Sequence, residues 1–201
     1  MAIMTIRGWL AVWLGAALIG CAPAPLASTT VEDAQGADAP TVEFPVLGPA
    51  PELVGDAWLN TDEPLTLAGL RGKVVLLEMW TFGCVNCRNT LPTLNDWHTR
   101  FADQGLVVIG NHYPEFEYEA DLGQLKRAVV DLGITYPVVQ DNSGDNFFAY
   151  RARYWPTIYL IDRLGRLRYT HIGEGAYDET EQAIQTLLLD ETNGDLERDA
   201  T

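Results

Sequence analysis

The hydrophobic and polar positions between residues 70 and 190 change period several times along the chain. Two nearly continuous apolar runs, VVLLEMW at residues 74–80 and LVVIG at residues 106–110, predict central strands that are covered on both faces. Apolar residues at helical spacing predict helices over residues 89–104 and 117–132, each followed by a glycine. Strands that alternate with helices in this way indicate an α/β fold.

Shorter elements follow and precede these four. They are a strand at 136–139, a helix at 146–153, a strand that opens after Pro156, an antiparallel strand at 166–172 and an amphipathic helix at 177–189. Before the first central strand, residues 56–67 contain two extended pieces around a polar turn, which predicts an N-terminal β-hairpin. The whole pattern predicts an α/β sandwich.

The first 42 residues differ in character from the rest. Arg7 is followed by an apolar run over residues 8–19, which is short for a membrane span and fits the apolar region of a secretory signal. The next residues, Leu18-Ile19-Gly20-Cys21, resemble the bacterial lipobox, in which the cysteine becomes lipidated. An uncleaved anchor and an ordinary secretory signal are the alternatives.

These features divide the chain into four parts. We expect a lipoprotein signal peptide at residues 1–20, the lipidated Cys21 with a flexible tether to residue 42, one domain at residues 43–190, and an acidic tail at residues 191–201. The tether is rich in Ala, Pro, Ser, Thr and Asp without periodicity, and such a composition cannot bury a core. The domain is long enough to bury a core without disulfides.

The charge of the chain argues against one class of partner. The sequence has 28 acidic residues against 13 Lys and Arg, which gives a formal net charge of −15. Binding to phosphates requires clustered Lys and Arg, so we expect no nucleic-acid partner. The excess of acid is the pattern of a soluble surface.

Cys84 and Cys87 are the first candidate for chemistry. The pair stands between a predicted strand and a predicted helix, in the stretch WTFGCVNCRNTLPTL, which is the setting of a redox-active C-x-x-C. The positive end of the helix dipole favours the thiolate form of the first cysteine. Cys84 is therefore the expected nucleophile and Cys87 the expected resolving thiol. If Cys21 carries lipid, the three cysteines leave one pair.

Other uses of the pair are less favoured. A zinc site needs about four ligands, and the sequence has no second cysteine pair, while His98, His112 and His171 lack ligand spacing. A purely structural disulfide would close a very short loop and gain little stability. A peroxidase of the peroxiredoxin type is less favoured because both cysteines lie in one tight C-x-x-C. We therefore expect no metal and no cofactor beyond the redox-active disulfide Cys84–Cys87.

Three further positions are candidates for the site. Glu78 interrupts a buried strand, where a carboxylate is costly unless it is paired or functional. It could exchange a proton with Cys87, or it could reach an edge or pair with Lys73. Pro156 follows Trp155 in an extended context, where a cis bond and an ordinary trans bond are both open. His112 follows the second central strand, either as a site residue or in a capped loop.

With these motifs in place, the chain resembles thioredoxin-fold thiol:disulfide oxidoreductases of the TlpA/ResA type, which act outside the cytoplasm. Within that group it is most like the C-terminal thioredoxin domain of DipZ-type cytochrome c biogenesis proteins. The similar stretches are WLNTDEPLTLAGLRGKVVLLEMWTFGCVNCRNTLPTL, VVIGNHYPEFEYE and YWPTIYLIDRLGRLRYTHIGEGAYDETE. The resemblance implies a thioredoxin-like three-layer sandwich with a helix–strand insertion over residues 117–139.

The resemblance also implies roles for residues. Cys84 and Cys87 match the active pair, Glu78 the buried carboxylate and Pro156 the cis-proline that faces the pair, with Trp155 beside it for substrate positioning. Gly83 replaces a frequent tryptophan, and residues 85–86, Val-Asn, replace the usual Gly-Pro or Pro-Pro. Because that dipeptide influences the redox potential, the direction of catalysis stays open. Trp155 is bulkier than the usual residue and narrows access.

We therefore expect a monomeric, lipid-anchored thiol–disulfide oxidoreductase in the bacterial cell envelope or periplasm. It would reduce disulfides of protein substrates with electrons from a membrane thiol donor, in agreement with a role in cytochrome c maturation. A disulfide oxidase or isomerase with the same C-x-x-C is one alternative. A non-catalytic lipoprotein that uses the fold as a binding module is the other.

Overall fold

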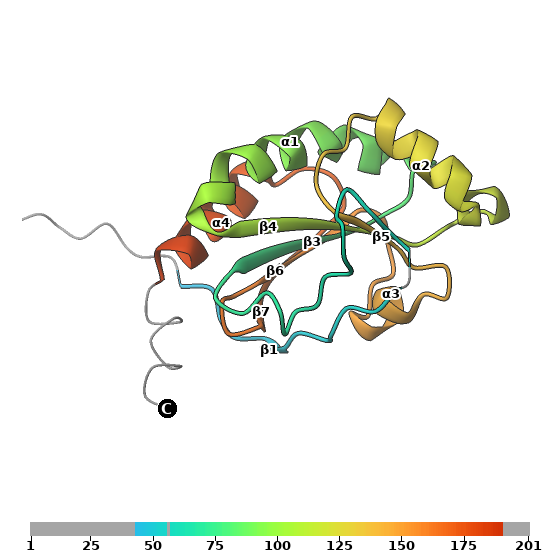
Figure 1. Cartoon of the computed structure of the whole chain (residues 1–201). Helices are drawn as coiled ribbons and strands as arrows, with labels where there is room; N and C mark the ends of the chain where they lie inside the picture. The colour runs from blue at the N-terminus through green and yellow to red at the C-terminus, as the bar shows by residue number, and fades with distance from the viewer. Residues whose placement is uncertain (1–42, 56, 191–201) are drawn as a thin grey trace, which may run out of the picture. The chain divides into compact units, whose positions relative to one another are not determined.

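A seven-stranded mixed sheet forms the middle layer of the described part of the chain, residues 43–55 and 57–190 of a computed structural model (Figure 1). The strand order is β1-β7-β6-β3-β4-β5-β2. The strands are β1 (Gly48–Pro49), β2 (Trp58–Leu59), β3 (Val74–Trp80), β4 (Leu106–His112), β5 (Val138–Gln140), β6 (Thr157–Ile161) and β7 (Arg166–Ile172). Parallel pairing joins β3, β4 and β5, and the other pairs are antiparallel.

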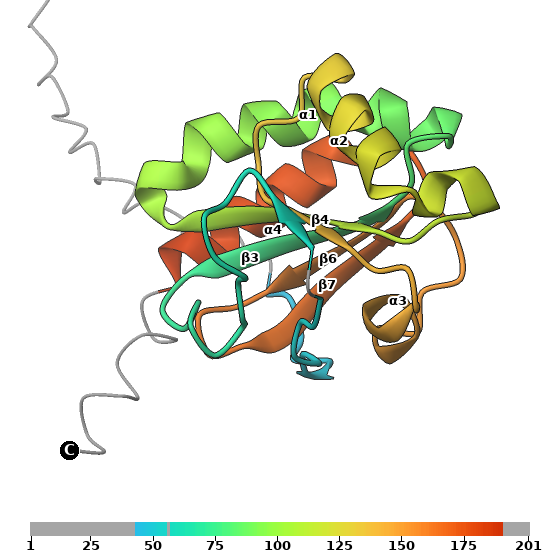
Figure 2. The ribbon, with the colours of Figure 1, turned by 45° about the vertical axis from the view of Figure 1, so that its right-hand side comes forward.

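Helices cover both faces of this sheet, as Figures 1 and 2 show from two directions. On one face lie α1 (Val85–Phe101), α2 (Leu122–Asp131) and α4 (Tyr177–Leu189), and on the other lie α3 (Asp145–Ala149) and the N-terminal segment. The three layers confirm the predicted sandwich. The predicted insertion is also present, as the 3₁₀ helix η2 (Glu117–Ala120) followed by α2 and β5.

Strand β3 carries the core on both of its faces. Every side chain from Val74 to Trp80 is buried. Val74, Leu76 and Trp80 pack toward α1 and α4, whereas the alternate residues pack toward α3. This two-sided burial follows from the position of β3 between β4 and β6, and it explains the unbroken apolar run in the sequence. Glu78 is therefore in the centre of the sheet and not at an edge.

Helix α1 begins four residues earlier than the apolar spacing predicts. Cys84 is its N-cap, and the Cys84 sulfur accepts a hydrogen bond from the backbone N–H of Cys87. Pro92 lies inside the helix, and the buried face carries Leu91, Leu94 and Trp97. A cap of this kind leaves no signal in the hydrophobic pattern, because Cys87 is the one buried residue among residues 85–88.

The predicted N-terminal hairpin over residues 56–67 is wrong. Strand β2 pairs with β5, in the register Trp58 to Val139, and residues 65–67 form no strand. The Glu52 carboxylate accepts hydrogen bonds from the backbone N–H groups of Leu67 and Ala68. A side chain thus satisfies the donors that a strand partner would have used. Leu67 packs into the core beneath the sheet.

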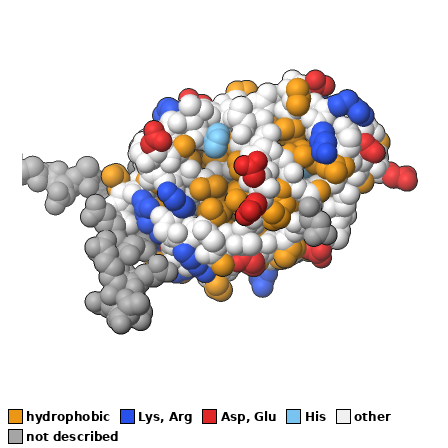
Figure 3. All heavy atoms as spheres, viewed as in Figure 1, with side chains coloured by type: hydrophobic (Ala, Val, Ile, Leu, Met, Phe, Trp, Pro, Cys, Tyr) orange, Lys and Arg blue, Asp and Glu red, His pale blue; other side chains and the backbone are white. Residues whose placement is uncertain are grey.

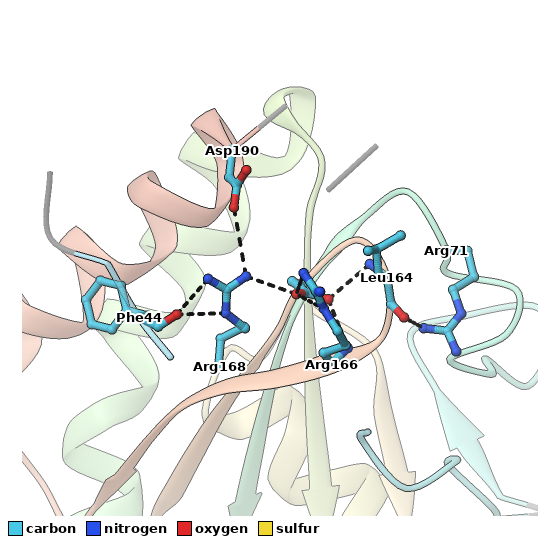
Figure 4. Close-up of polar contacts among 7 residues, drawn as sticks. Phe44, Arg71, Leu164, Arg166, Arg168 and Asp190 are labelled. Carbon is cyan, nitrogen blue, oxygen red and sulfur yellow. Dashed lines mark hydrogen bonds and ion pairs between the residues drawn. The ribbon is translucent and has the colours of Figure 1, made fainter. Parts of the chain in front are cut away.

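An arginine on β7 ties together the two ends of the described chain (Figure 4). Arg168 donates two hydrogen bonds to the carbonyl oxygen of Phe44 and forms an ion pair with Asp162 at 3.0 Å. It also lies 3.8 Å from the carboxylate of Asp190, just after α4. Arg166 shares Asp162 with it. The first and last described segments are thereby fixed to the same end of β7.

Residues 1–42 and 191–201 lie outside the described residues, and so do the signal peptide, Cys21, the tether and the acidic tail. Within the described residues, none of the helices is both long and apolar enough to cross a membrane. On the face in Figure 3, the Lys and Arg side chains form separate small groups and not one continuous basic surface.

Candidate active site

Cys84 and Cys87 lie at the C-terminal edge of β3, at the first turn of α1. Cys84 is partly exposed and Cys87 is fully buried, and both are free thiols. The backbone N–H of Cys87 points at the sulfur of Cys84 at 3.2 Å. A negative charge on Cys84 would receive this hydrogen bond at the positive end of the helix. Burial, with the nearby Glu78 as the second cause, raises the pKa of the Cys87 thiol far above its ordinary value.

Cys84 opens onto a cleft of about 490 Å³. One side of the cleft is formed by residues 83–86, and the remaining walls by Glu115 and residues 153–155. The bond between Trp155 and Pro156 is cis, which is the first of the two alternatives that the sequence left open. Trp155 is thus one of the residues that line the cleft into which Cys84 opens.

Glu78 lies beneath the pair on the face of the sheet that α1 covers. Its carboxyl is fully buried and accepts a hydrogen bond from the Thr90 hydroxyl at 2.7 Å, with the Tyr136 hydroxyl at 3.5 Å on its other oxygen. Burial raises the pKa of Glu78 to about 8, although these two hydrogen bonds lower it. Its partners are thus Thr90 and Tyr136, and the alternative of pairing with Lys73 is wrong.

The Thr90 hydroxyl connects Glu78 to the resolving cysteine. It lies 2.7 Å from Glu78 Oε1 and 2.6 Å from the carbonyl oxygen of Cys87. One hydroxyl proton cannot serve both acceptors at once. The Thr90 hydroxyl therefore serves either acceptor in turn and ties the Glu78 carboxyl to the first turn of α1. Burial outweighs the hydrogen bonds from Thr90 and Tyr136, and the resulting pKa of about 8 favours a protonated Glu78 at neutral pH.

His112 is the last residue of β4 and not part of a loop. Its ring is buried and stacks on Phe82 at a centroid distance of 5.3 Å. Burial lowers the pKa of His112 to about 4, so the ring is neutral. The Nε2 atom accepts the backbone N–H of Phe82 at 3.4 Å and lies 3.3 Å from the Thr81 hydroxyl. His112 thus supports the loop that leads into Cys84.

The sequence analysis missed three polar residues around the pair. Thr90 carries a weak signal, because it lies three residues after Cys87 on the buried face of α1. Tyr136 and the fully buried Glu119 carry none, since each reaches the site only through the tertiary fold. Among the described residues, no group of three or more His, Cys, Asp and Glu is placed to hold a metal.

Comparisons with known proteins agree with this arrangement. The model of the AhpC/TSA family matches residues 36–170. Protein DipZ of Mycobacterium tuberculosis (strain CDC 1551 / Oshkosh) is 43% identical over 150 residues, which cover 73% of this chain and 22% of DipZ. The chain thus spans about a fifth of the length of the first curated relatives that it matches.

Two further proteins match over nearly their whole length. Thiol-disulfide oxidoreductase YkuV of Bacillus subtilis (strain 168) is 31% identical, over 71% of this chain and 95% of YkuV. The crystal structure of a thiol-disulfide isomerase from Corynebacterium glutamicum superposes with a TM-score of 0.61 at 30% identity, over 70% of this chain and 97% of the other. The solved structures that match are thioredoxin-like, which confirms the predicted fold class.

Proposed function

The chain belongs to the AhpC/TSA family and is a thioredoxin-fold thiol–disulfide oxidoreductase; on this premise we propose that it reduces disulfides of protein substrates through Cys84 and Cys87. The observation that carries the proposal is the contrast between the two sulfurs. Cys84 opens onto a cleft at a helix N-terminus, and Cys87 is buried above a carboxyl whose pKa is about 8. One thiol can meet a substrate and the other cannot.

The first step is attack by the Cys84 thiolate on one sulfur of the substrate disulfide. A mixed disulfide forms, and the other substrate sulfur leaves as a thiolate. Trp155, whose bond to Pro156 is cis, lines the same cleft, where it would position the substrate chain. The backbone N–H of Cys87 holds the Cys84 sulfur in place before the attack.

In the second step the Cys87 sulfur attacks Cys84 and releases the reduced substrate. Cys87 must lose its proton as it attacks, and burial makes the free thiolate costly. The ionised form of Glu78 would accept this proton and return it when the pair is reduced again. With a pKa near 8, Glu78 can do both close to neutral pH. Two electrons pass from the pair to the substrate, and the chain is left with a Cys84–Cys87 disulfide.

Insulin reduction tests the proposal. Cys84→Ser should abolish the activity, and Cys87→Ser should stop it at the mixed disulfide, which mass spectrometry would detect. Full activity of Cys84→Ser would refute the assignment. The reduction potential gives the direction: a value near the thioredoxin potential of about −270 mV supports a reductase, and a value near about −120 mV would make the protein a disulfide donor.

We further propose that the protein is a lipoprotein attached through Cys21 and that it works outside the cytoplasm. The support is the lipobox-like sequence at residues 18–21 and the resemblance to DipZ-type proteins. A reductase in that location requires a membrane thiol donor, and cytochrome c maturation is the process that the resemblance suggests. Cys21→Ser should move the protein from the membrane fraction to the soluble fraction; an unchanged membrane fraction would contradict lipidation at Cys21.

A further inference from the structure

Two exposed aromatic side chains stand beside the active-site loop. Phe116 and Tyr118 stack with a centroid distance of 5.9 Å and an interplanar angle of 9°, and each is about half exposed. Tyr118 also packs against Phe82, two residues before Cys84. Glu115, from the same segment, lines the cleft into which Cys84 opens. Phe116 and Tyr118 thus form an exposed aromatic pair, the aromatic wall, which follows Glu115 just outside the lining of the cleft.

The buried carboxylate of Glu119 fixes this wall to the active-site loop. Its Oε1 accepts the backbone N–H of Gly83 at 2.8 Å. Its Oε2 accepts the backbone N–H groups of Glu115 at 2.7 Å and Phe116 at 2.9 Å. One side chain thus joins the residue before Cys84 to the start of the wall.

The glycine at position 83 makes this contact possible. A Cβ atom there would overlap the Glu119 carboxylate and would lie 2.9 Å from the Tyr118 hydroxyl oxygen. The absence of a side chain at Gly83 therefore goes together with the close approach of the wall.

The lining of the cleft is itself partly apolar. Val85 and Tyr154 line it and are both more than half exposed, and Trp155, which also lines it, stacks on the ring of Phe147. A disulfide that reacts with Cys84 must bring its sulfur to the Cys84 sulfur. The residues that flank the substrate cysteine then lie over this lining or beside it, next to the aromatic wall, where apolar side chains would bury apolar surface.

We propose that Phe116 and Tyr118, held in place by Glu119, select polypeptide disulfides that carry an apolar side chain next to the cysteine. Phe116 and Tyr118 are specificity residues, and Glu119 is a positioning residue that acts through them. The proposal rests on the proposed function, because it takes Cys84 as the attacking group.

Two short peptides that differ at one position test the selectivity. Each carries a cysteine in a mixed disulfide with thionitrobenzoate, and the neighbouring residue is Leu in one peptide and Ser in the other. The reduced protein delivers two electrons to this disulfide, which yields a free peptide thiol, coloured thionitrobenzoate and the Cys84–Cys87 disulfide. In this single turnover, with peptide in excess, we expect the second-order rate constant to be at least fivefold higher for the Leu peptide, mainly because the rate saturates at a lower peptide concentration.

The double variant Phe116→Ser/Tyr118→Ser should reduce this preference to less than twofold, because both side chains are on the surface and their loss removes only the wall. Glu119→Gln should also reduce the preference. The three backbone N–H groups now bond to two carboxylate oxygens of Glu119, whereas a glutamine amide offers one oxygen. Val130→Ser is the matched control: Val130 is a highly exposed apolar residue of α2 outside the cleft, and its loss should leave the preference unchanged.

The preference is a ratio, so a general loss of active protein does not alter it. An equal rate with both peptides in the unchanged protein, or a preference that survives in the double variant, would overturn the inference. Neither result would affect the proposed function, which fails only if the protein releases no thionitrobenzoate from either peptide or if Cys84→Ser still releases it.

Discussion

Glu78→Gln should make the stability of the domain less dependent on pH. In the folded chain burial raises the pKa of Glu78 from 4.5 to about 8, whereas in the unfolded chain it returns to the ordinary value. Between these two values the folded state holds a proton that the unfolded state has lost. The unfolding free energy therefore falls as the pH rises through this window, and Glu78 has no such effect below it.

The size of the effect follows from the two pKa values. At about 1.4 kcal/mol for each tenfold change in proton affinity, Glu78 should lower the unfolding free energy by about 3 kcal/mol between pH 5 and pH 8. A glutamine does not titrate, so the variant should lack this loss. Other titrating groups contribute equally to both proteins and cancel in the comparison.

Urea unfolding at pH 5, 6, 7 and 8 measures the difference. Both proteins should carry Cys84→Ser and Cys87→Ser, because the unfolded thiols would otherwise titrate in the upper part of the range. If the two pH profiles run parallel to within about 1 kcal/mol, Glu78 is not a carboxyl that burial keeps protonated in the folded chain, and the proton-transfer role would lose its support.

Three further predictions concern the surroundings of the site. Gly83→Ala should cost about 1–3 kcal/mol in urea unfolding, because the new Cβ overlaps the Glu119 carboxylate; an unchanged midpoint would contradict the tight fit. Arg168→Ala should cost about 1.5–3 kcal/mol, because it removes the charge-assisted hydrogen bonds to Asp162 and to the Phe44 carbonyl while Arg166 still pairs with Asp162, yet insulin reduction by the folded variant should match the unchanged protein. The His112 ring should stay neutral between pH 5 and pH 8 in an NMR titration, because burial lowers its pKa to about 4; a midpoint near 6.5 would show a solvated ring.

The sequence predicted those elements whose hydrophobic period comes from burial. The structure agrees with the predicted limits of β3, β7 and α4. In each of them the buried positions can be recognised from the spacing of apolar residues in the sequence. The prediction of the N-terminal hairpin failed because the backbone N–H groups of Leu67 and Ala68 bond to the Glu52 side chain, a contact that no local pattern shows. The early start of α1 was missed for a related reason, since Cys84 is an unusual cap.

Site residues could be predicted only where their spacing in the sequence, or the free-energy cost of burying a charge, distinguished them from their neighbours. The three-residue spacing of Cys84 and Cys87 marked the pair, and the cost of a charge in an apolar strand marked Glu78. Neither rule applies to Tyr136 or Glu119. These two come from the insertion, and they reach the site because β5 lies beside β4 and η2 lies beside the active-site loop.

The contacts of Arg168 with Phe44 and Asp190 determine where the domain can be joined to another protein or to a solid support. Arg168 holds both Phe44 and Asp190, and it also pairs with Asp162. Asp162 directly follows Ile161, which pairs with Val75. The two described ends of the domain therefore lie near the beginning of β3. The cleft lies beyond the other end of this strand, about 20 Å away at the usual rise per residue. A support, a fusion partner or a neighbouring domain can thus be joined at either end of the domain without blocking access to Cys84. The same layout allows such a domain to form one part of a much longer chain.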